Sequence, residues 1–224
     1  MHVLETGRVR GVVFDLWNTL AFDPHCPNPF VALVDAYGLR DDPGILERAI
    51  MCQELSGIEE AIAVLARVTH RTLDPLQGEA LSRIWRNAGE RVRLFPDAEE
   101  ALPRLAGRFR LGLLSNTQSF GLEFLDSLGP IFQARLFSYE LGVLKPDPAM
   151  FSQIAERLRL APRHLLMVGD HLRDDVLGAE AAGWQALLLR RSNASLSFRE
   201  RDLDRRPLES LLELIDLLLP RRTS

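Results

Sequence analysis

Four short apolar runs divide the chain, and each is followed by a polar or glycine-containing turn. They cover residues 12–14, 111–114, 165–168 and 186–189. Their hydrophobic positions hardly alternate, which is typical of strands buried on both faces of a parallel sheet. Between them, hydrophobic residues recur at helical spacing over 97–106, 148–160 and 174–183. This alternation of strands and helices predicts an α/β fold with a doubly wound parallel sheet.

One long interval breaks this alternation. From about Pro24 to Leu94 the spacing is helical throughout, and it predicts amphipathic helices over 45–55, 58–68 and 76–92. An insertion after the first strand lies above the carboxyl edge of the sheet, where α/β proteins bind ligands. We therefore expect a core and an all-helical cap inserted after strand 1. The core would comprise residues 1–23 and 95–224, and the cap residues 24–94.

Composition and charge narrow the class of protein. The 224 residues are 46% hydrophobic and 26% charged, which is ordinary for a globular protein that buries a core. The net charge is -4 and basic residues cluster only in pairs, so neither nucleic acid nor an anionic membrane surface is an expected partner. The first ten residues lack an apolar signal core and the apolar runs are short, so we expect a cytoplasmic protein. We also expect a monomer or a homodimer. Cys26 and Cys52 are too few for a disulfide framework or a zinc site.

Polar side chains stand where three of the predicted strands end. Asp15 follows the first strand, Ser115 the second and Asp170 the third. Because the carboxyl ends of parallel strands meet at one edge of a sheet, we expect these side chains to lie together. Lys145, in the turn before Pro146, supplies a positive charge.

These groups suit attack by an aspartate on phosphorus. The attack requires a divalent cation and a lysine that offset the repulsion between carboxylate and phosphate. Mg²⁺ prefers hard oxygen ligands, so Asp15, the backbone carbonyl of Trp17 and Asp170 form a candidate metal site. Trp17 could also stack on a substrate, although a packing role for its ring is an equal alternative.

Further residues are candidates for contact with the transferred phosphoryl group. Lys145 would offset its charge, and the hydroxyls of Ser115 and Thr19 would hold its non-bridging oxygens. Asn116, next to Ser115, is a further candidate for substrate binding. Thr19 has a plainer alternative role, which is to cap the segment that follows it.

The order and spacing of these residues resemble the four motifs of the haloacid dehalogenase-like (HAD) superfamily. Asp15–Leu20 resembles motif I, Asp-x-Asp-x-Thr, while Ser115 and Lys145 resemble motifs II and III. Gly169–Asp175 resembles motif IV. Flanking segments resemble the subgroup with an all-helical cap between motifs I and II. These segments cover residues 137–143 and 178–183.

The resemblance implies a Rossmann-like core, Mg²⁺ and an aspartyl-phosphate on Asp15. It also implies a small phosphorylated substrate that the cap selects. Asp174 and Asp175 compete for the last acidic position of motif IV, and we favour Asp175, whose spacing matches the longer form Gly-Asp-x-x-x-x-Asp. The expected metal ligands are therefore Asp15, Trp17, Asp170 and Asp175.

One position departs from the motif. Family phosphatases have a second aspartate two residues after the nucleophile, where it protonates the leaving group, and this chain has Trp17 there. An indole cannot act as an acid, so a general-acid contribution of roughly 10²–10⁴-fold is missing. Three explanations are open. The substrate has a good leaving group, such as an acyl or aryl phosphate; His25, Asp23 or a cap residue transfers the proton; or the protein binds a ligand with hardly any turnover.

The same departure keeps a 2-haloacid dehalogenase as an alternative. Dehalogenases of the superfamily also lack the second aspartate, use no metal, and hold the substrate carboxylate with a cap arginine. Arg40 and Arg48 are the candidates for that arginine. Asp170 and Asp175 favour the phosphatase, because a metal-free site gains nothing from further carboxylates beside Asp15.

Overall fold

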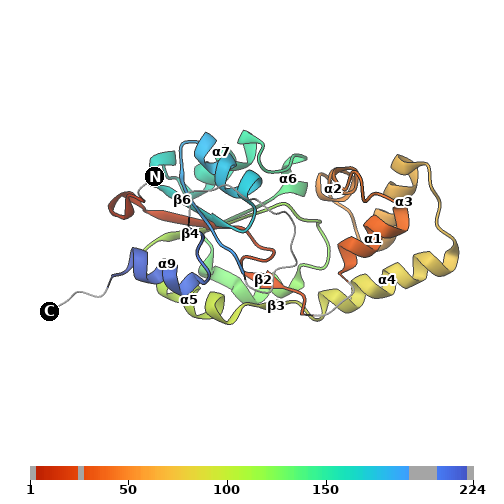
Figure 1. The fold of residues 1–224 in the computed structure, drawn as a ribbon, viewed down its shortest axis with the longest axis horizontal. Helices are drawn as coiled ribbons and strands as arrows, with labels where there is room; N and C mark the ends of the chain where they lie inside the picture. Colours follow the sequence, from red (N-terminus) through yellow and green to blue (C-terminus); the bar gives the residue numbers. More distant parts are fainter. Residues whose placement is uncertain (1–3, 25–27, 192–205, 221–224) are drawn as a thin grey trace.

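A five-stranded parallel sheet forms the centre of the molecule (Figure 1). The structure, a computed structural model, describes residues 4–24, 28–191 and 206–220. The strand order is β5-β4-β1-β6-β7, and every pairing within this sheet is parallel. The strands are β1 (Gly11–Phe14), β4 (Arg110–Ser115), β5 (Ala134–Phe137), β6 (Leu165–Gly169) and β7 (Gln185–Leu188). The predicted α/β class with a Rossmann-like, doubly wound sheet is confirmed.

Helices cover both faces of this sheet, which explains the continuous apolar runs of its strands. In β1, Val12 and Phe14 face the cluster that α5 (Pro96–Ala106) and α9 (Leu211–Leu218) complete. Val13 points to the other face and packs in the cluster of α7 (Pro148–Leu158). Figure 1 shows α5 and α9 on one side of the sheet and α7 on the other.

The helices of the core confirm two predicted segments and correct a third. The α5 and α7 helices begin within one residue of the predicted starts, and Asp147 caps α7 by accepting a hydrogen bond from the Ala149 N–H at 2.8 Å. The predicted helix over 174–183 is instead a π-helical turn, Leu172–Leu177, followed by the short helix α8, Gly178–Ala181. The remaining short helices are η1 (Thr6–Arg8), η2 (Glu123–Ile131), α6 (Ser138–Leu141) and η3 (Pro162–His164).

Four helices follow β1 and pack on one another beside the sheet (Figure 1). They are α1 (Pro29–Tyr37), α2 (Gly44–Met51), α3 (Ile58–Thr69) and α4 (Pro75–Gly89). They share a hydrophobic cluster of their own, centred on fully buried side chains such as Leu33, Ile50 and Leu65. We call these four helices the α1–α4 group.

Two features of this region were not predicted. The α1 helix has strong end signals, since the Asn28 side chain accepts hydrogen bonds at its start and Gly38 ends it in a left-handed conformation with φ of 68°. Where the chain leaves and re-enters the core, β2 (Ala21–Phe22) and β3 (Arg93–Leu94) pair antiparallel. The interval to Leu94 is therefore not helical throughout, because its last residues form this ribbon and α4 already ends at Gly89.

None of the helices in the described ranges combines the length and the apolar character that crossing a membrane requires.

Candidate active site

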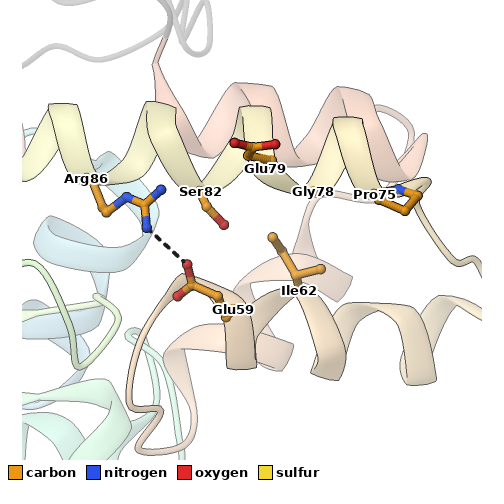
Figure 2. A pocket seen from close by; sticks show the side chains of 7 residues that line it. All are labelled: Glu59, Ile62, Pro75, Gly78, Glu79, Ser82 and Arg86. Carbon is orange, nitrogen blue, oxygen red and sulfur yellow. Dashed lines mark ion pairs between the residues drawn. The ribbon is translucent and has the colours of Figure 1, made fainter.

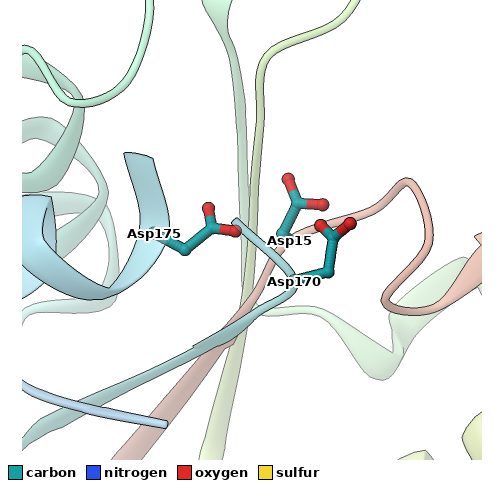
Figure 3. A group of neighbouring side chains, drawn as sticks. All are labelled: Asp15, Asp170 and Asp175. Carbon is teal, nitrogen blue, oxygen red and sulfur yellow. The ribbon is translucent and has the colours of Figure 1, made fainter. Parts of the chain in front are cut away.

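Three carboxylates meet at the carboxyl edge of the sheet (Figure 3). Asp15 follows β1, Asp170 follows β6, and Asp175 lies in the π-helical turn. One oxygen from each lies within 4.8 Å of the others, an arrangement that suits a divalent cation. The order of the strands reverses between β1 and β6, and ligands bind at such a point in doubly wound sheets. Of the two rival aspartates, Asp175 belongs to this group and Asp174 does not.

A glycine allows Asp175 to approach the end of β6. A Cβ atom on Gly169 would lie 2.2 Å from Asp175 Oδ2, far inside van der Waals contact. That same oxygen accepts a hydrogen bond from the His171 N–H at 2.9 Å. His171 Nδ1 in turn accepts from the Asp174 N–H at 3.2 Å, so the His171 ring helps to cap the turn that carries Asp175.

Lys145, the single lysine of the chain, bridges two of the carboxylates. Its buried Nζ donates to Asp15 Oδ1 and Asp175 Oδ1, each at 2.6 Å, and to the Leu114 carbonyl at 3.0 Å. Burial alone would lower the pKa of Lys145, but the two carboxylates outweigh burial and hold that pKa above its ordinary value. The ammonium therefore stays charged at the centre of the site.

Asp15 and Asp170 have raised pKa values, because they are buried close to other carboxylates. Burial is the main cause that raises the pKa of Asp15 to about 6, against the attraction of Lys145. Burial, followed by repulsion from Asp15 and Asp175, raises the pKa of Asp170 to about 8. Three carboxylates around one ammonium leave negative charge in excess when all are ionised, and a divalent cation would compensate it.

The hydroxyls of Ser115 and Thr19 are buried without a hydrogen-bond partner in the described part of the chain. A buried hydroxyl without a partner is costly, and such a group at a sheet edge suits an absent ligand. The alternative that Thr19 caps the next segment is wrong, because its Oγ1 makes no such bond.

Asn116 contacts the main chain of Lys145 through both ends of its amide. Its Oδ1 accepts from the Lys145 N–H at 2.7 Å, and its Nδ2 donates to the Lys145 carbonyl at 3.2 Å. These contacts fix the main chain of Lys145 against the residue that follows Ser115. The expected contact between Asn116 and a substrate stays a prediction.

The indole of Trp17 is fixed by core contacts. Its Nε1 donates to Thr117 Oγ1 at 3.0 Å, and its ring is tilted against Phe124 with centroids 5.8 Å apart. The side chain is half-buried against the cluster of α5 and α9. Packing therefore accounts for the contacts of this ring, and stacking on a substrate stays a prediction.

His25 and Asp23 are the two named candidates to replace the missing acid, and of these the structure describes Asp23. His25 lies outside the described residues. The carboxylate of Asp23 faces Arg91, with Oδ1 3.8 Å from the arginine Nε.

A cavity of about 720 Å³ opens beside Lys145, between the α1–α4 group and the core. Glu47 and Arg48 of α2 line it on one side, and Arg173 and Asp174 line it on the other. Burial, followed by repulsion from Asp174, raises the pKa of Glu47. Arg48 therefore shares this cavity with Lys145, whereas Arg40 pairs with Asp35 at 2.6 Å.

A smaller groove of about 400 Å³ lies between α3 and α4, away from this edge (Figure 2). An ion pair between Arg86 and Glu59, 3.6 Å apart, spans one end of it. Of the candidate site residues in the described part of the chain, none lines this groove, whereas Lys145 lines the larger cavity.

Sequence comparison identifies the family. A model of the haloacid dehalogenase-like hydrolases matches residues 9–183, most of the chain. The protein therefore belongs to this family of hydrolases, and the predicted resemblance to the family is confirmed.

Several curated relatives of the chain are phosphatases. The chain is 32% identical over 161 residues to a ribulose-1,5-bisphosphate 5-phosphatase of Halopiger xanaduensis, covering 66% of this chain and 67% of that protein. It is 34% identical over 115 residues to a glyceraldehyde 3-phosphate phosphatase of Methanothermobacter thermautotrophicus, covering 50% of each. Among the first curated relatives, the match spans only about half of their length or less.

The chain shares its fold with solved structures of both a phosphatase and a dehalogenase. A HAD phosphatase from Thermococcus onnurineus has a TM-score of 0.64 at 21% identity, covering 96% of this chain and 100% of that one. A 2-haloacid dehalogenase from Pseudomonas syringae has a TM-score of 0.62 at 22% identity, covering 94% and 98%. At these identities the likeness shows the fold alone.

Proposed function

We propose that the protein is a Mg²⁺-dependent phosphatase of a small phosphorylated metabolite, with Asp15 as covalent nucleophile. The observation that carries the proposal is the bridge from Lys145 to Asp15 and Asp175, with Asp170 in the same cluster. A dehalogenase needs one carboxylate, whereas three converge here. The curated phosphatase relatives support the same reaction class.

The residues present fit a magnesium ion. Asp15, Asp170 and Asp175 would hold it with the backbone carbonyl of Trp17, and the carboxylate oxygens are the hard ligands that the ion prefers. When bound, Mg²⁺ would neutralise the phosphoryl oxygens as a Lewis acid.

Lys145, Ser115 and Thr19 have separate roles in the proposed phosphoryl transfer. Lys145 holds one oxygen of Asp15, and the other oxygen attacks phosphorus as the bond to the leaving oxygen breaks. The Ser115 and Thr19 hydroxyls, which have no hydrogen-bond partner among the described residues, donate to the non-bridging oxygens. Water then attacks the phosphorus of the aspartyl-phosphate, which frees inorganic phosphate and restores the Asp15 carboxylate.

Trp17 sets the range of leaving groups. Its indole N–H is already bonded to Thr117 and carries no acidic proton for a leaving alkoxide. We propose that acyl and aryl phosphates, whose leaving groups need little protonation, are better substrates than alkyl phosphates.

The α1–α4 group and its flanking residues, 24–94, are proposed as the cap that selects the substrate. The cavity beside Lys145 supports this role, because residues of α2 line it together with Lys145. Cytoplasmic location and a monomeric or homodimeric state stay predictions.

A 2-haloacid dehalogenase is the second candidate. Arg48 lines the cavity beside Lys145, where an arginine could hold a substrate carboxylate, and Trp17 is aromatic as in dehalogenases. This reaction would need no metal, so EDTA separates the two candidates.

Phosphate release from acetyl phosphate, p-nitrophenyl phosphate and a panel of sugar and nucleotide monophosphates tests the proposal. We expect turnover that requires Mg²⁺, favours acyl and aryl phosphates, and disappears in Asp15→Asn. Asp216→Asn, the same change on the exposed side of α9, is the matched control and keeps wild-type activity. Halide release from 2-chloropropionate in EDTA, without phosphate release, would establish the dehalogenase instead.

A further inference from the structure

Arg191 is a buried cation outside the carboxylate cluster. Its side chain is only 7% exposed, and its guanidinium lies 3.9 Å from the centre of the Phe95 ring. Nη1 donates to Asp97 Oδ2 and Nη2 donates to the Thr19 carbonyl, both at 2.6 Å. One side chain after β7 therefore holds both the start of α5 and the loop that follows the nucleophile.

Asp97 is a rigid partner for this arginine. Its Oδ2 also accepts from Ser210 Oγ at 2.7 Å and from the Leu211 N–H at 2.8 Å, at the start of α9. Burial alone would raise the pKa of Asp97, but the hydrogen bonds from Arg191, Ser210 and Leu211 outweigh it and lower that pKa. The carboxylate stays ionised and holds the guanidinium of Arg191. Asp97 itself is held in place because it lies in α5 and is bonded to the start of α9.

The loop held by Arg191 carries Thr19. The Thr19 carbonyl accepts from Arg191 and the next carbonyl, that of Leu20, accepts from the Phe95 N–H at 2.9 Å. Within the loop, the Asn18 N–H donates to the Ala21 carbonyl at 2.8 Å, with Asn18 in a left-handed conformation of φ 57°. The peptide group after Thr19 is thus fixed from outside the loop, and the place of the buried Thr19 hydroxyl follows from it.

We propose that Arg191 is a positioning residue, which sets the Thr19 hydroxyl where it holds a non-bridging oxygen of the phosphoryl group. This role rests on the proposed phosphatase function. It uses the fork of the guanidinium, since separate N–H groups serve Asp97 and Thr19 at once. A lysine at this position keeps a charge for Asp97, but its single nitrogen lacks the fixed planar fork that directs separate N–H groups at Asp97 and at Thr19.

Arg191→Lys separates positioning from simple stabilisation. We expect the variant to fold, because Asp97 keeps a cationic partner, and to lose about tenfold or more in kcat with KM changed less than about threefold. In a Thr19→Val background the same change should have no further effect, because two groups that act as one are not additive. Arg190→Lys, one residue earlier on an exposed side chain, is the matched control and keeps wild-type kcat.

A spectroscopic signal tests the position of the loop without any turnover. The indole N–H resonance of Trp17, assigned through Trp17→Phe, reports on the residue two before Thr19. We expect Arg191→Lys to shift this resonance and to leave those of Trp85 and Trp184 unchanged. Ser210→Ala, which removes one bond to Asp97, is a milder variant and should shift the Trp17 signal by a smaller amount.

The two proposals can fail separately. If wild type releases no phosphate from any substrate, the phosphatase function fails, and the Trp17 resonance still decides whether Arg191 fixes the loop that carries Thr19. If wild type is active but Arg191→Lys keeps its kcat, or if both variants leave the Trp17 resonance in place, Arg191 is not a positioning residue.

Discussion

The carboxyl edge of the sheet and the α1–α4 group are held together by different forces. At the edge, Asp15, Lys145 and Asp175 are buried charges in direct contact, with Gly169 in close approach. The α1–α4 group is held by an apolar cluster and by helix caps, such as the capping box of Asp74 and Gln77. Buried charges depend on every partner, whereas apolar contacts tolerate change when volume is kept. The edge is therefore expected to tolerate few substitutions, whereas the α1–α4 group is expected to tolerate those that keep its volume.

Removal of the central charge should have the largest effect. Lys145→Met leaves the Asp15 and Asp175 carboxylates facing each other without their shared cation. We expect phosphate release to fall about 10³-fold or more, and the free energy of unfolding to fall by about 3 kcal/mol. Activity assays and urea unfolding measure the two losses, and activity within threefold of wild type would contradict the account of the edge.

The close approach at Gly169 predicts the next largest effect. In Gly169→Ala, the new methyl group would overlap Asp175 Oδ2, so the carboxylate must move away from the cluster. We expect the affinity for Mg²⁺ to fall by about 10- to 100-fold, as for groups that orient metal ligands. Magnesium titration of phosphate release measures it, with Gly7→Ala as the control because a Cβ atom there meets nothing within 4 Å. An unchanged Mg²⁺ dependence would show that Asp175 does not need this glycine.

A contact between the two regions predicts a smaller effect on substrate binding. Ser119 Oγ, in the loop after β4, donates to the Leu55 carbonyl and accepts from the Leu55 N–H, both at 2.7 Å. Ser119→Ala should cost about 1–2 kcal/mol of stability and raise KM more than it lowers kcat, because α2 lines the cavity. Steady-state kinetics measure the split, with exposed Ser127→Ala as the control. A fall in kcat alone would place this contact in the chemistry.

The smallest expected effect lies within the α1–α4 group. Gly78 is inside α4, and a Cβ atom there meets nothing within 4 Å. Gly78→Ala should raise the free energy of unfolding by about 0.5–1 kcal/mol, because alanine loses less backbone entropy in a helix. Thermal unfolding and phosphate release together check this gain against unchanged activity. The same substitution should thus be harmful at Gly169 and helpful at Gly78.

Local sequence signals predicted the parts of the fold that depend on neighbours along the chain. Buried strands such as β1 have continuous apolar runs, and the polar residue at each strand end follows from topology. The β5 strand was missed because Arg135 interrupts its apolar run, and β2 and β3 because they have two residues each. The prediction of one continuous helix over 174–183 was wrong, because the spacing of hydrophobic residues does not distinguish a π-helical turn from an α-helix.

Contacts between distant residues explain what could not be predicted of the site. The bond from Arg191 to Thr19 joins positions 172 residues apart, and that from Trp17 to Thr117 joins positions 100 apart. Neither bond can be predicted from a local sequence pattern. Each depends on how the residues after β7 or after β4 pack against the loop that follows Asp15. The choice between Asp174 and Asp175 could be predicted, because the motif spacing favours Asp175, and Asp175 is the one that joins the carboxylate group at the end of β6.

The most direct test of the central claim is to trap the phosphorylated enzyme. Wild type, Asp15→Asn and Asp216→Asn are mixed with acetyl phosphate and Mg²⁺, quenched in acid during turnover, digested and analysed by mass spectrometry. The account predicts one phosphoryl group on the peptide that contains Asp15, present in wild type and Asp216→Asn and absent from Asp15→Asn. Phosphate release without any phosphoryl group on Asp15, or a phosphoryl group on another residue, would contradict it.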